Sequence, residues 1–214
     1  MDIYLVRHGE TESNRERRYL GWTESPLSTL GLRQAERTAY FLAGERINAL
    51  YCSDLNRAFH TARVIGKSCA LQPEPGSLLR EIHFGQWEGL TFDEIEKAWG
   101  DRISRWLDDP YHHAAPGGES LKEVCSRMHA FLEDLNSLPS AGQRIAAVSH
   151  GGSIRALLFK VLGLDRSGFW DIKIDNASVS LIRKEGDHFK VIYYNRTHHL
   201  GDGNQIEEGV NDNQ

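Results

Sequence analysis

The chain has 214 residues, 40% of them hydrophobic and 26% charged, which suits one domain with a sizeable core. The net charge of -5 leaves no basic stripe to neutralise a phosphate backbone, so we expect no nucleic-acid partner. No run approaches the roughly 18 to 20 apolar residues of a membrane span, and the N-terminus lacks a signal-peptide core, so we expect a cytoplasmic protein without a membrane partner.

Two short apolar runs end in similar reactive sequences. Residues 3–6 lead into Arg7 and His8, and residues 145–149 lead into His150 and Gly151. Each run is rich in branched side chains and soon followed by glycine, which is typical of a buried parallel strand. Because open α/β sheets bind ligands beyond the carboxyl ends of their strands, we expect both histidines at one crevice.

Helices and strands are expected to alternate along the rest of the chain. Ser28 can cap an amphipathic helix, and a strand over 49–53 passes into a helix over 56–67. Ser120 and Glu123 form a capping box for a long helix with an apolar stripe over 121–135. The pattern predicts an α/β fold, a three-layer α/β/α sandwich with a mainly parallel central sheet.

The last predicted elements are another helix and a hairpin. Ile154 and Val161 bound the apolar stripe of a helix that follows the strand at 145–149. Two β-rich runs, 179–183 and 189–194, are joined through Gly186. We expect these elements to complete the sheet.

The domain prediction is a single domain over residues 1–200 with a cap-like insertion over 84–118. Thr91 and Glu94 make a capping box for a short helix inside this aromatic-rich insertion. Its aromatic rings are expected to pack the cap, with a base-stacking surface as the alternative. Residues 201–214 carry four acidic residues and no Lys or Arg, which predicts a disordered acidic tail.

The chain resembles the histidine phosphatase superfamily, also called phosphoglycerate-mutase-like, in five blocks that occur in the same order. These blocks are residues 7–14 with 21–35, residues 53–62, residues 79–89, residues 118–120 and residues 149–152. The resemblance implies a phosphoglycerate-mutase-like fold and phosphoryl chemistry at a histidine.

The residue types support the same chemistry independently of the resemblance. Phosphoryl transfer needs an in-line nucleophile and positive charge around the equatorial oxygens. Neutral His8 can be the nucleophile if its near ring nitrogen donates to a backbone carbonyl and leaves the far nitrogen unprotonated. Arg7 and Arg57 would clamp the oxygens through two-point hydrogen bonds, with His150 as a third, protonated donor.

Further donors are expected around the phosphoryl group. The Gly151 amide at a helix start and the Asn14 side chain are candidate phosphate ligands. Trp22, which belongs to the second part of the first block, and its neighbour Thr23 are further candidate substrate or phosphate contacts.

We expect neither a metal ion nor a cofactor. The cationic cluster already supplies the positive charge that magnesium would bring. The adjacent histidine pairs at 112–113 and 198–199 lack the spacing of a helical chelate. Cys52, Cys69 and Cys125 are too far apart in sequence to suggest a zinc site and are expected to be reduced packing residues.

The resemblance assigns the general acid to Glu81. A leaving alkoxide must be protonated, and a carboxylic acid near a bound phosphate dianion keeps its proton more readily. From the residues alone, Glu10, Glu24 and Glu88 also remain candidates for this role.

The segment around Glu81 resembles the phosphatase branch, which includes α-ribazole phosphatase of cobalamin synthesis. We therefore expect a phosphomonoesterase whose partner is a small-molecule phosphate ester, with α-ribazole 5′-phosphate as one candidate. A ring-bearing leaving group would gain stacking contacts if the cap brought Trp87 or Trp106 over the site. The alternatives are a cofactor-dependent phosphoglycerate mutase and a non-catalytic phospho-ligand-binding protein; the sequence does not indicate an oligomeric state.

Overall fold

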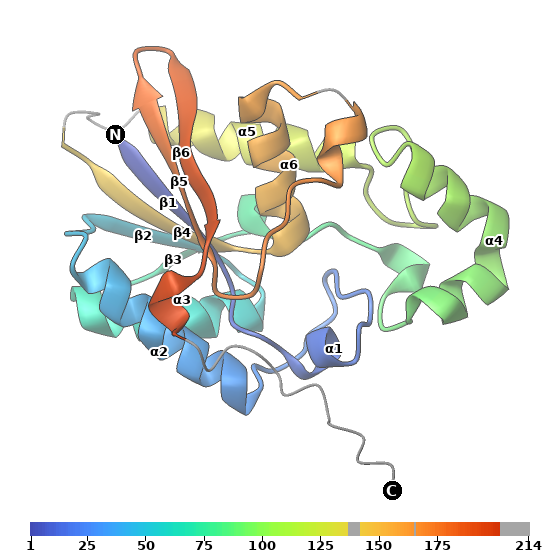
Figure 1. Ribbon diagram of the computed structural model, residues 1–214, viewed down its shortest axis with the longest axis horizontal. Helices are drawn as coiled ribbons and strands as arrows, with labels where there is room; N and C mark the ends of the chain where they lie inside the picture. The colour runs from blue at the N-terminus through green and yellow to red at the C-terminus, as the bar shows by residue number, and fades with distance from the viewer. Residues whose placement is uncertain (137–141, 165, 202–214) are drawn as a thin grey trace, which may run out of the picture.

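The computed structural model describes residues 1–136, 142–164 and 166–201, and a six-stranded sheet with helices on both faces forms its centre (Figure 1). The predicted acidic tail, apart from Gly201, lies outside the described residues. The strands are β1 (Asp2–Arg7), β2 (Ala49–Ser53), β3 (Glu74–Gly76), β4 (Arg144–Ser149), β5 (Val179–Glu185) and β6 (His188–Arg196).

The sheet order is β3-β2-β4-β1-β5-β6. Strands β1 to β4 pair in parallel, whereas β5 runs antiparallel to both of its neighbours. The predicted hairpin is confirmed, with Gly186 at its turn in the left-handed region at φ 63°. The mainly parallel sheet is therefore confirmed, and β3 is an edge strand that the pattern did not predict.

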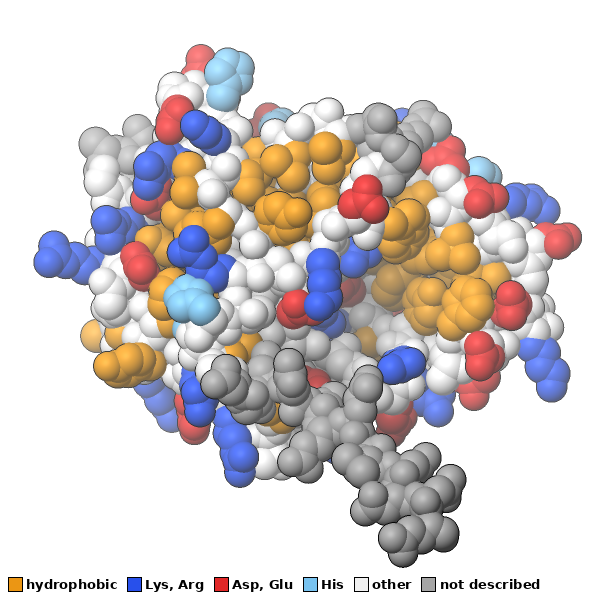
Figure 2. Space-filling model, in the orientation of Figure 1, with side chains coloured by type: hydrophobic (Ala, Val, Ile, Leu, Met, Phe, Trp, Pro, Cys, Tyr) orange, Lys and Arg blue, Asp and Glu red, His pale blue; other side chains and the backbone are white. Residues whose placement is uncertain are grey.

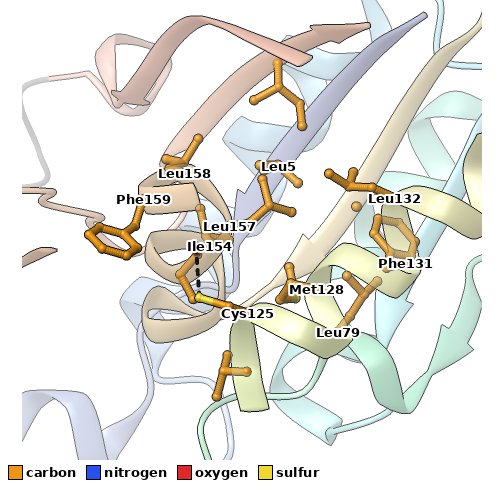
Figure 3. Close-up of a cluster of buried hydrophobic side chains, with 14 of the residues drawn as sticks. Leu5, Leu79, Cys125, Met128, Phe131, Leu132, Ile154, Leu157, Leu158 and Phe159 are labelled. Carbon is orange, nitrogen blue, oxygen red and sulfur yellow. Dashed lines mark hydrogen bonds between the residues drawn. The ribbon is translucent and has the colours of Figure 1, made fainter. Parts of the chain in front are cut away.

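Alternating side chains of β1 face two different helical layers. Ile3 and Leu5 pack against α5 (Leu121–Asn136) and α6 (Gly151–Leu162), as Figure 3 shows for Leu5. Tyr4 and Val6 pack on the opposite side against α2 (Thr29–Ala43) and α3 (Asn56–Cys69). This period of two between two helical layers confirms the three-layer sandwich.

The helix starts follow the predicted caps. The Ser28 side chain accepts a hydrogen bond from the Gly31 amide at 3.0 Å. The Glu123 carboxylate accepts hydrogen bonds from the amide and the hydroxyl of Ser120, each at 2.7 Å. These capping bonds satisfy polar groups that the first turn of a helix leaves unpaired.

Helix α4 (Phe92–Asp108) projects to one side of the sheet and belongs to a region with its own small core (Figure 1). The Thr91–Glu94 capping box is confirmed, but the helix is 17 residues long and not short. It kinks at Trp99, whose φ of −135° and ψ of 23° are non-helical. The side chains of this core are Trp87, Ile95, Ile103, Trp106 and Ala115.

The core of this region corrects one expectation about substrate contacts. Trp87 is fully buried and Trp106 is 4% exposed, so neither ring can stack on a substrate in this conformation. The rings pack the cap region, as the first interpretation of the aromatic stretch predicted.

Among the described residues, no helix is both long and apolar enough to cross a membrane.

Candidate active site

Parallel pairing of β1 and β4 brings the two histidines together. Arg7 pairs with Ser149 at the carboxyl ends of these strands, and the His8 amide donates to the Ser149 carbonyl at 3.0 Å. The rings of His8 and His150 follow directly, with centroids 5.0 Å apart and planes at 63°. The carboxyl ends of β1 and β4 therefore bring both imidazoles together, as predicted. In the orientation of Figure 1, Figure 2 shows charged side chains of both signs around a hollow between the sheet and α4.

The hydrogen bonds of His8 fix its tautomer. Its Nδ1 lies 2.7 Å from the Gly9 carbonyl oxygen, and Arg57 Nε donates to its Nε2 at 3.3 Å. A guanidinium can only donate, so Nε2 must accept and Nδ1 must carry the proton. The predicted hydrogen bond from the near ring nitrogen, Nδ1, to a backbone carbonyl is therefore confirmed. The lone pair on Nε2 gives the ring nucleophilic character.

Burial and charge keep the His8 ring neutral. Its exposed fraction is 2%, and burial, followed by the charges of Arg57 and Arg7, holds its pKa well below the ordinary value of 6.5. Both causes disfavour the imidazolium form. The His8 ring is therefore neutral across the neutral pH range.

Arg57 lies in the first turn of α3 and is 1% exposed. Its Nη1 donates to the Thr23 carbonyl at 3.1 Å and its Nη2 to the Gly21 carbonyl at 2.6 Å. These bonds hold the guanidinium plane beside His8. The rigid, always charged fork is suited to phosphoryl oxygens.

Arg7 ends β1 on the same side of the site. Its Nη1 donates to the Ile174 carbonyl at 2.7 Å, while its buried Nε has no hydrogen-bond partner among the described residues. A Cβ at Gly151 would lie 3.2 Å from this Nε, so the glycine allows the helix start to approach the guanidinium closely. Arg7 Nε is thus a donor available to an anion.

His150 is the N-cap residue of α6 and is completely buried. Neither of its ring nitrogens has a hydrogen-bond partner in the described part of the chain. Burial and the charge of Arg57 hold its pKa well below 6.5, so the ring is neutral in the ligand-free protein. The expectation of a protonated His150 therefore applies only with an anion bound, whose charge would favour the imidazolium.

The Glu81 carboxylate lies at the start of α6. It accepts hydrogen bonds from the amides of Gly152 and Ser153, each at 3.0 Å, and from the Ile82 amide at 2.8 Å. A Cβ at Gly152 would lie 2.5 Å from Glu81 Oε1, so only glycine permits this approach. Burial lowers the pKa of Arg7 and of Arg57, and the negative charge of Glu81 acts against this lowering. Glu81 therefore lies close enough to both arginines to interact with them electrostatically.

Two of the other acidic candidates are occupied elsewhere. The Glu10 carboxylate accepts from the Ser28 hydroxyl at 2.7 Å. The Glu88 carboxylate accepts from the Trp22 amide at 2.8 Å and the Thr23 amide at 2.6 Å. Glu24 is exposed and accepts from the Asn56 amide with both oxygens.

The loop candidates make mainly structural contacts. Trp22 Nε1 donates to the Glu81 carbonyl at 2.9 Å, and the Thr23 hydroxyl donates to Glu88. The Asn14 side-chain oxygen accepts a hydrogen bond from Asn176 Nδ2 at 3.1 Å. This contact leaves the side-chain Nδ2 of Asn14 to donate to an anion. Glu88 and Asn176, which sequence analysis did not assign these roles, thus organise the loops around the site.

The described residues contain no cluster of three or more histidine, cysteine or acidic side chains arranged to hold a metal ion. His112 instead pairs through Nδ1 with Asp109 at 2.9 Å. All three cysteines are free, with Cys52 and Cys125 buried.

Comparison with known proteins identifies the family to which the chain belongs. The family model described as histidine phosphatase superfamily (branch 1) matches residues 3–197. A putative phosphoserine phosphatase 2 of Hydrogenobacter thermophilus is 34% identical over 197 residues, which are 92% of this chain and 96% of that protein. A probable phosphoglycerate mutase of Photorhabdus laumondii is 36% identical over 185 residues, 85% of this chain and 84% of the relative.

A solved structure has the same fold. The putative alpha-ribazole-5′-P phosphatase of Escherichia coli superposes with a TM-score of 0.83 at 28% identity, covering 92% of this chain and 96% of its own. The sheet and the helical layers therefore belong to a known architecture.

Proposed function

The chain belongs to the histidine phosphatase superfamily, and we propose that it is a phosphomonoesterase that hydrolyses a small-molecule phosphate ester through a phosphohistidine intermediate. The observation that carries the proposal is the pair of hydrogen bonds on His8, from Nδ1 to Gly9 and from Arg57 to Nε2. They hold the far nitrogen unprotonated beside a phosphate-binding cation, as in-line attack requires.

In the first step, the Nε2 lone pair of His8 forms a bond to phosphorus as the ester P–O bond breaks. Arg7, Arg57 and His150 bind the non-bridging oxygens, and the Gly151 amide and Asn14 are proposed as further donors. The leaving alkoxide takes its proton from the Glu81 carboxyl.

In the second step, a water oxygen attacks phosphorus and transfers its proton to the Glu81 carboxylate. The electron pair of the P–N bond returns to His8 Nε2, and inorganic phosphate leaves. Arg7 and Arg57 supply fixed positive charge to the transition state of both steps, so the proposed chemistry needs no metal or cofactor.

The substrate is proposed as a phosphate monoester of an alcohol. Similarity to the putative alpha-ribazole-5′-P phosphatase supports α-ribazole 5′-phosphate, and similarity to the putative phosphoserine phosphatase supports phosphoserine. Burial of Trp87 and Trp106 removes the stacking argument for a ring-bearing ester, so a panel must rank these substrates. A cytoplasmic location remains a prediction.

A phosphoglycerate mutase is the second candidate, because one relative carries that name. A mutase would return the phosphoryl group from His8 to a product hydroxyl, whereas a phosphatase transfers it to water. The experiment follows phosphate release in water enriched in oxygen-18, with phosphoserine, α-ribazole 5′-phosphate and 3-phosphoglycerate as substrates.

The proposal expects released phosphate that carries one solvent oxygen. Isomerisation of 3-phosphoglycerate that depends on a bisphosphate primer, without labelled phosphate, would favour the mutase. Retention of the esters without turnover would favour a non-catalytic binder.

A further inference from the structure

The backbone around Glu81 is held by one side chain from α5. Arg127 Nη1 donates to the carbonyl oxygens of Leu78 at 2.9 Å and Arg80 at 2.6 Å. Its Nη2 donates to the Glu81 carbonyl at 2.9 Å. One guanidinium therefore fixes three carbonyls at and immediately before the proposed acid, a task for which a lysine ammonium lacks the geometry.

Glu119 completes the arrangement on the other side of the acid. Its carboxylate accepts from Arg127 Nε at 3.0 Å and Nη2 at 3.1 Å, and also from the His83 amide at 2.9 Å. Its own amide donates to the His83 carbonyl at 2.8 Å. The pair therefore holds the chain both before and after Glu81.

The pair is shielded and rests on a rigid support. The side chains of Arg127 and Glu119 are only 13% and 19% exposed, unlike a surface ion pair of small energetic value. On α5, Val124 and Met128 are fully buried and fix the helix that carries Arg127. Precise placement of a reacting group requires a supporting side chain of this kind.

We propose that Arg127 and Glu119 are positioning residues that aim the Glu81 carboxyl group at the leaving oxygen, an inference that rests on the function proposed above. Glu81 is then held twice: α6 amides bind its carboxylate, and the Arg127–Glu119 pair fixes its backbone. Displacement of this backbone would misdirect the proton without removing the acid.

The nature of the leaving group separates this role from a purely structural one. An alkoxide leaves slowly unless it is protonated, whereas 2,4-dinitrophenolate leaves without a proton. Loss of the aim of Glu81 should therefore slow phosphoryl transfer to His8 from an alkyl ester and spare the same step from 2,4-dinitrophenyl phosphate. General damage to the site would slow both. Hydrolysis of the phosphohistidine, in which Glu81 acts as the base, is common to both esters and does not separate them.

The experiment compares kcat/KM, which reports phosphoryl transfer to His8, for Arg127→Met, Arg127→Lys and Glu119→Gln on the best alkyl ester of the substrate panel and on 2,4-dinitrophenyl phosphate. Glu81→Gln is the reference for loss of the acid. Arg183→Met is the matched control, because Arg183 makes a two-point pair with Asp2, at 2.6 and 3.0 Å, at the far end of β1 from Arg7.

For Arg127→Met we expect kcat/KM on the alkyl ester to fall about 10²-fold, the scale of a misplaced reacting group, with a loss of less than about threefold in kcat/KM on the aryl ester. The kcat/KM of Arg127→Lys on the alkyl ester should fall between those of Arg127→Met and the wild type. The control should match the wild type on both esters.

Equal losses on the two esters, or no loss on either, would overturn the proposal. If Arg127→Met does not fold, Glu119→Gln carries the same comparison, because it removes one charge and keeps the shape. Selective loss in Glu81→Gln without selective loss in either variant would reject only the positioning role. Absence of selective loss in Glu81→Gln would reject the acid itself.

Discussion

Arg57 Nε donates a hydrogen bond to His8 Nε2 over 3.3 Å, so the nucleophilic nitrogen faces the cation that would also bind the phosphoryl group. This contact excludes a proton from Nε2 in the ligand-free protein. In the proposed mechanism the lone pair would change partner from the guanidinium to phosphorus, and the Arg57 Nε–H would then be free to bind a phosphoryl oxygen. Arg57 would thus both hold Nε2 of His8 unprotonated and stabilise the transition state.

Replacement of Arg57 by lysine should therefore reduce kcat/KM strongly, although it conserves the charge. Lysine cannot donate simultaneously to His8, Thr23 and Gly21, so both the nucleophile and the phosphate clamp lose their orientation. We expect kcat/KM to fall by roughly 10² to 10³, the cost of a lost transition-state donor. Arg63→Lys, at an exposed position of the same helix, is the control; a similar loss there would contradict this account.

The stability of the ligand-free protein should decrease as the pH falls below about 6.5. His8 and His150 have pKa values held well below that value in the folded state, so the unfolded chain binds more protons in this range. Each histidine makes its full contribution to the free energy of unfolding above its unfolded-state pKa. As the pH falls from there toward the lower folded-state pKa, that contribution decreases by about 1.4 kcal/mol per pH unit for each histidine. Urea unfolding in phosphate-free buffer at pH 7.5 and 5.5 measures the slope, and His150→Gln should flatten it. An unchanged slope would show that His150 is not buried in its neutral form.

Gly152→Ala tests the close approach of Glu81 to α6. The added Cβ would lie 2.5 Å from Glu81 Oε1 and 2.7 Å from Ile82 Cδ1, so the carboxyl must move. We expect kcat for an alkyl phosphate to fall roughly 10²-fold, as for other small displacements of a reacting group. Gly100→Ala is the matched control, because nothing lies within 4 Å of its Cβ position. Unchanged kcat in Gly152→Ala would place the working position of Glu81 elsewhere.

Activity should survive exhaustive chelation. In the proposed mechanism, Arg7, Arg57 and a charged His150 would supply the positive charge that a metal ion brings to phosphoryl transfer in other enzymes. Steady-state kinetics after dialysis against a strong chelator should match those of untreated protein. A loss that magnesium or zinc reverses would contradict the metal-free mechanism.

The elements that place the histidines could be predicted because their signals are local. The apolar run before His8 and the caps Ser28 and Ser120 are short sequence features with a direct structural cause. Edge strand β3 was missed because it has three residues, one of them Pro75. The length of α4 was missed because the chain kinks at Trp99 and then continues as helix.

The supporting residues of the site could not be predicted from spacing. Arg127 reaches the Glu81 carbonyl across 46 positions and Glu88 reaches the Trp22 amide across 66. Such contacts depend on how elements pack, and neither helical nor strand periodicity records them. The motif containing Glu119 pointed to the right region, but its partner Arg127 is visible only in three dimensions.

The central claim is that the phosphoryl group is transferred to Nε2 of His8. The direct measurement is a rapid alkaline quench during turnover, followed by peptide mapping of the phosphorylated residue. Phosphate that is labile in acid and stable in base should be found on His8 alone. It should be absent from His8→Asn, whose turnover should be several orders of magnitude lower. Phosphate on a serine, cysteine or carboxylate, or full turnover by His8→Asn, would contradict the mechanism.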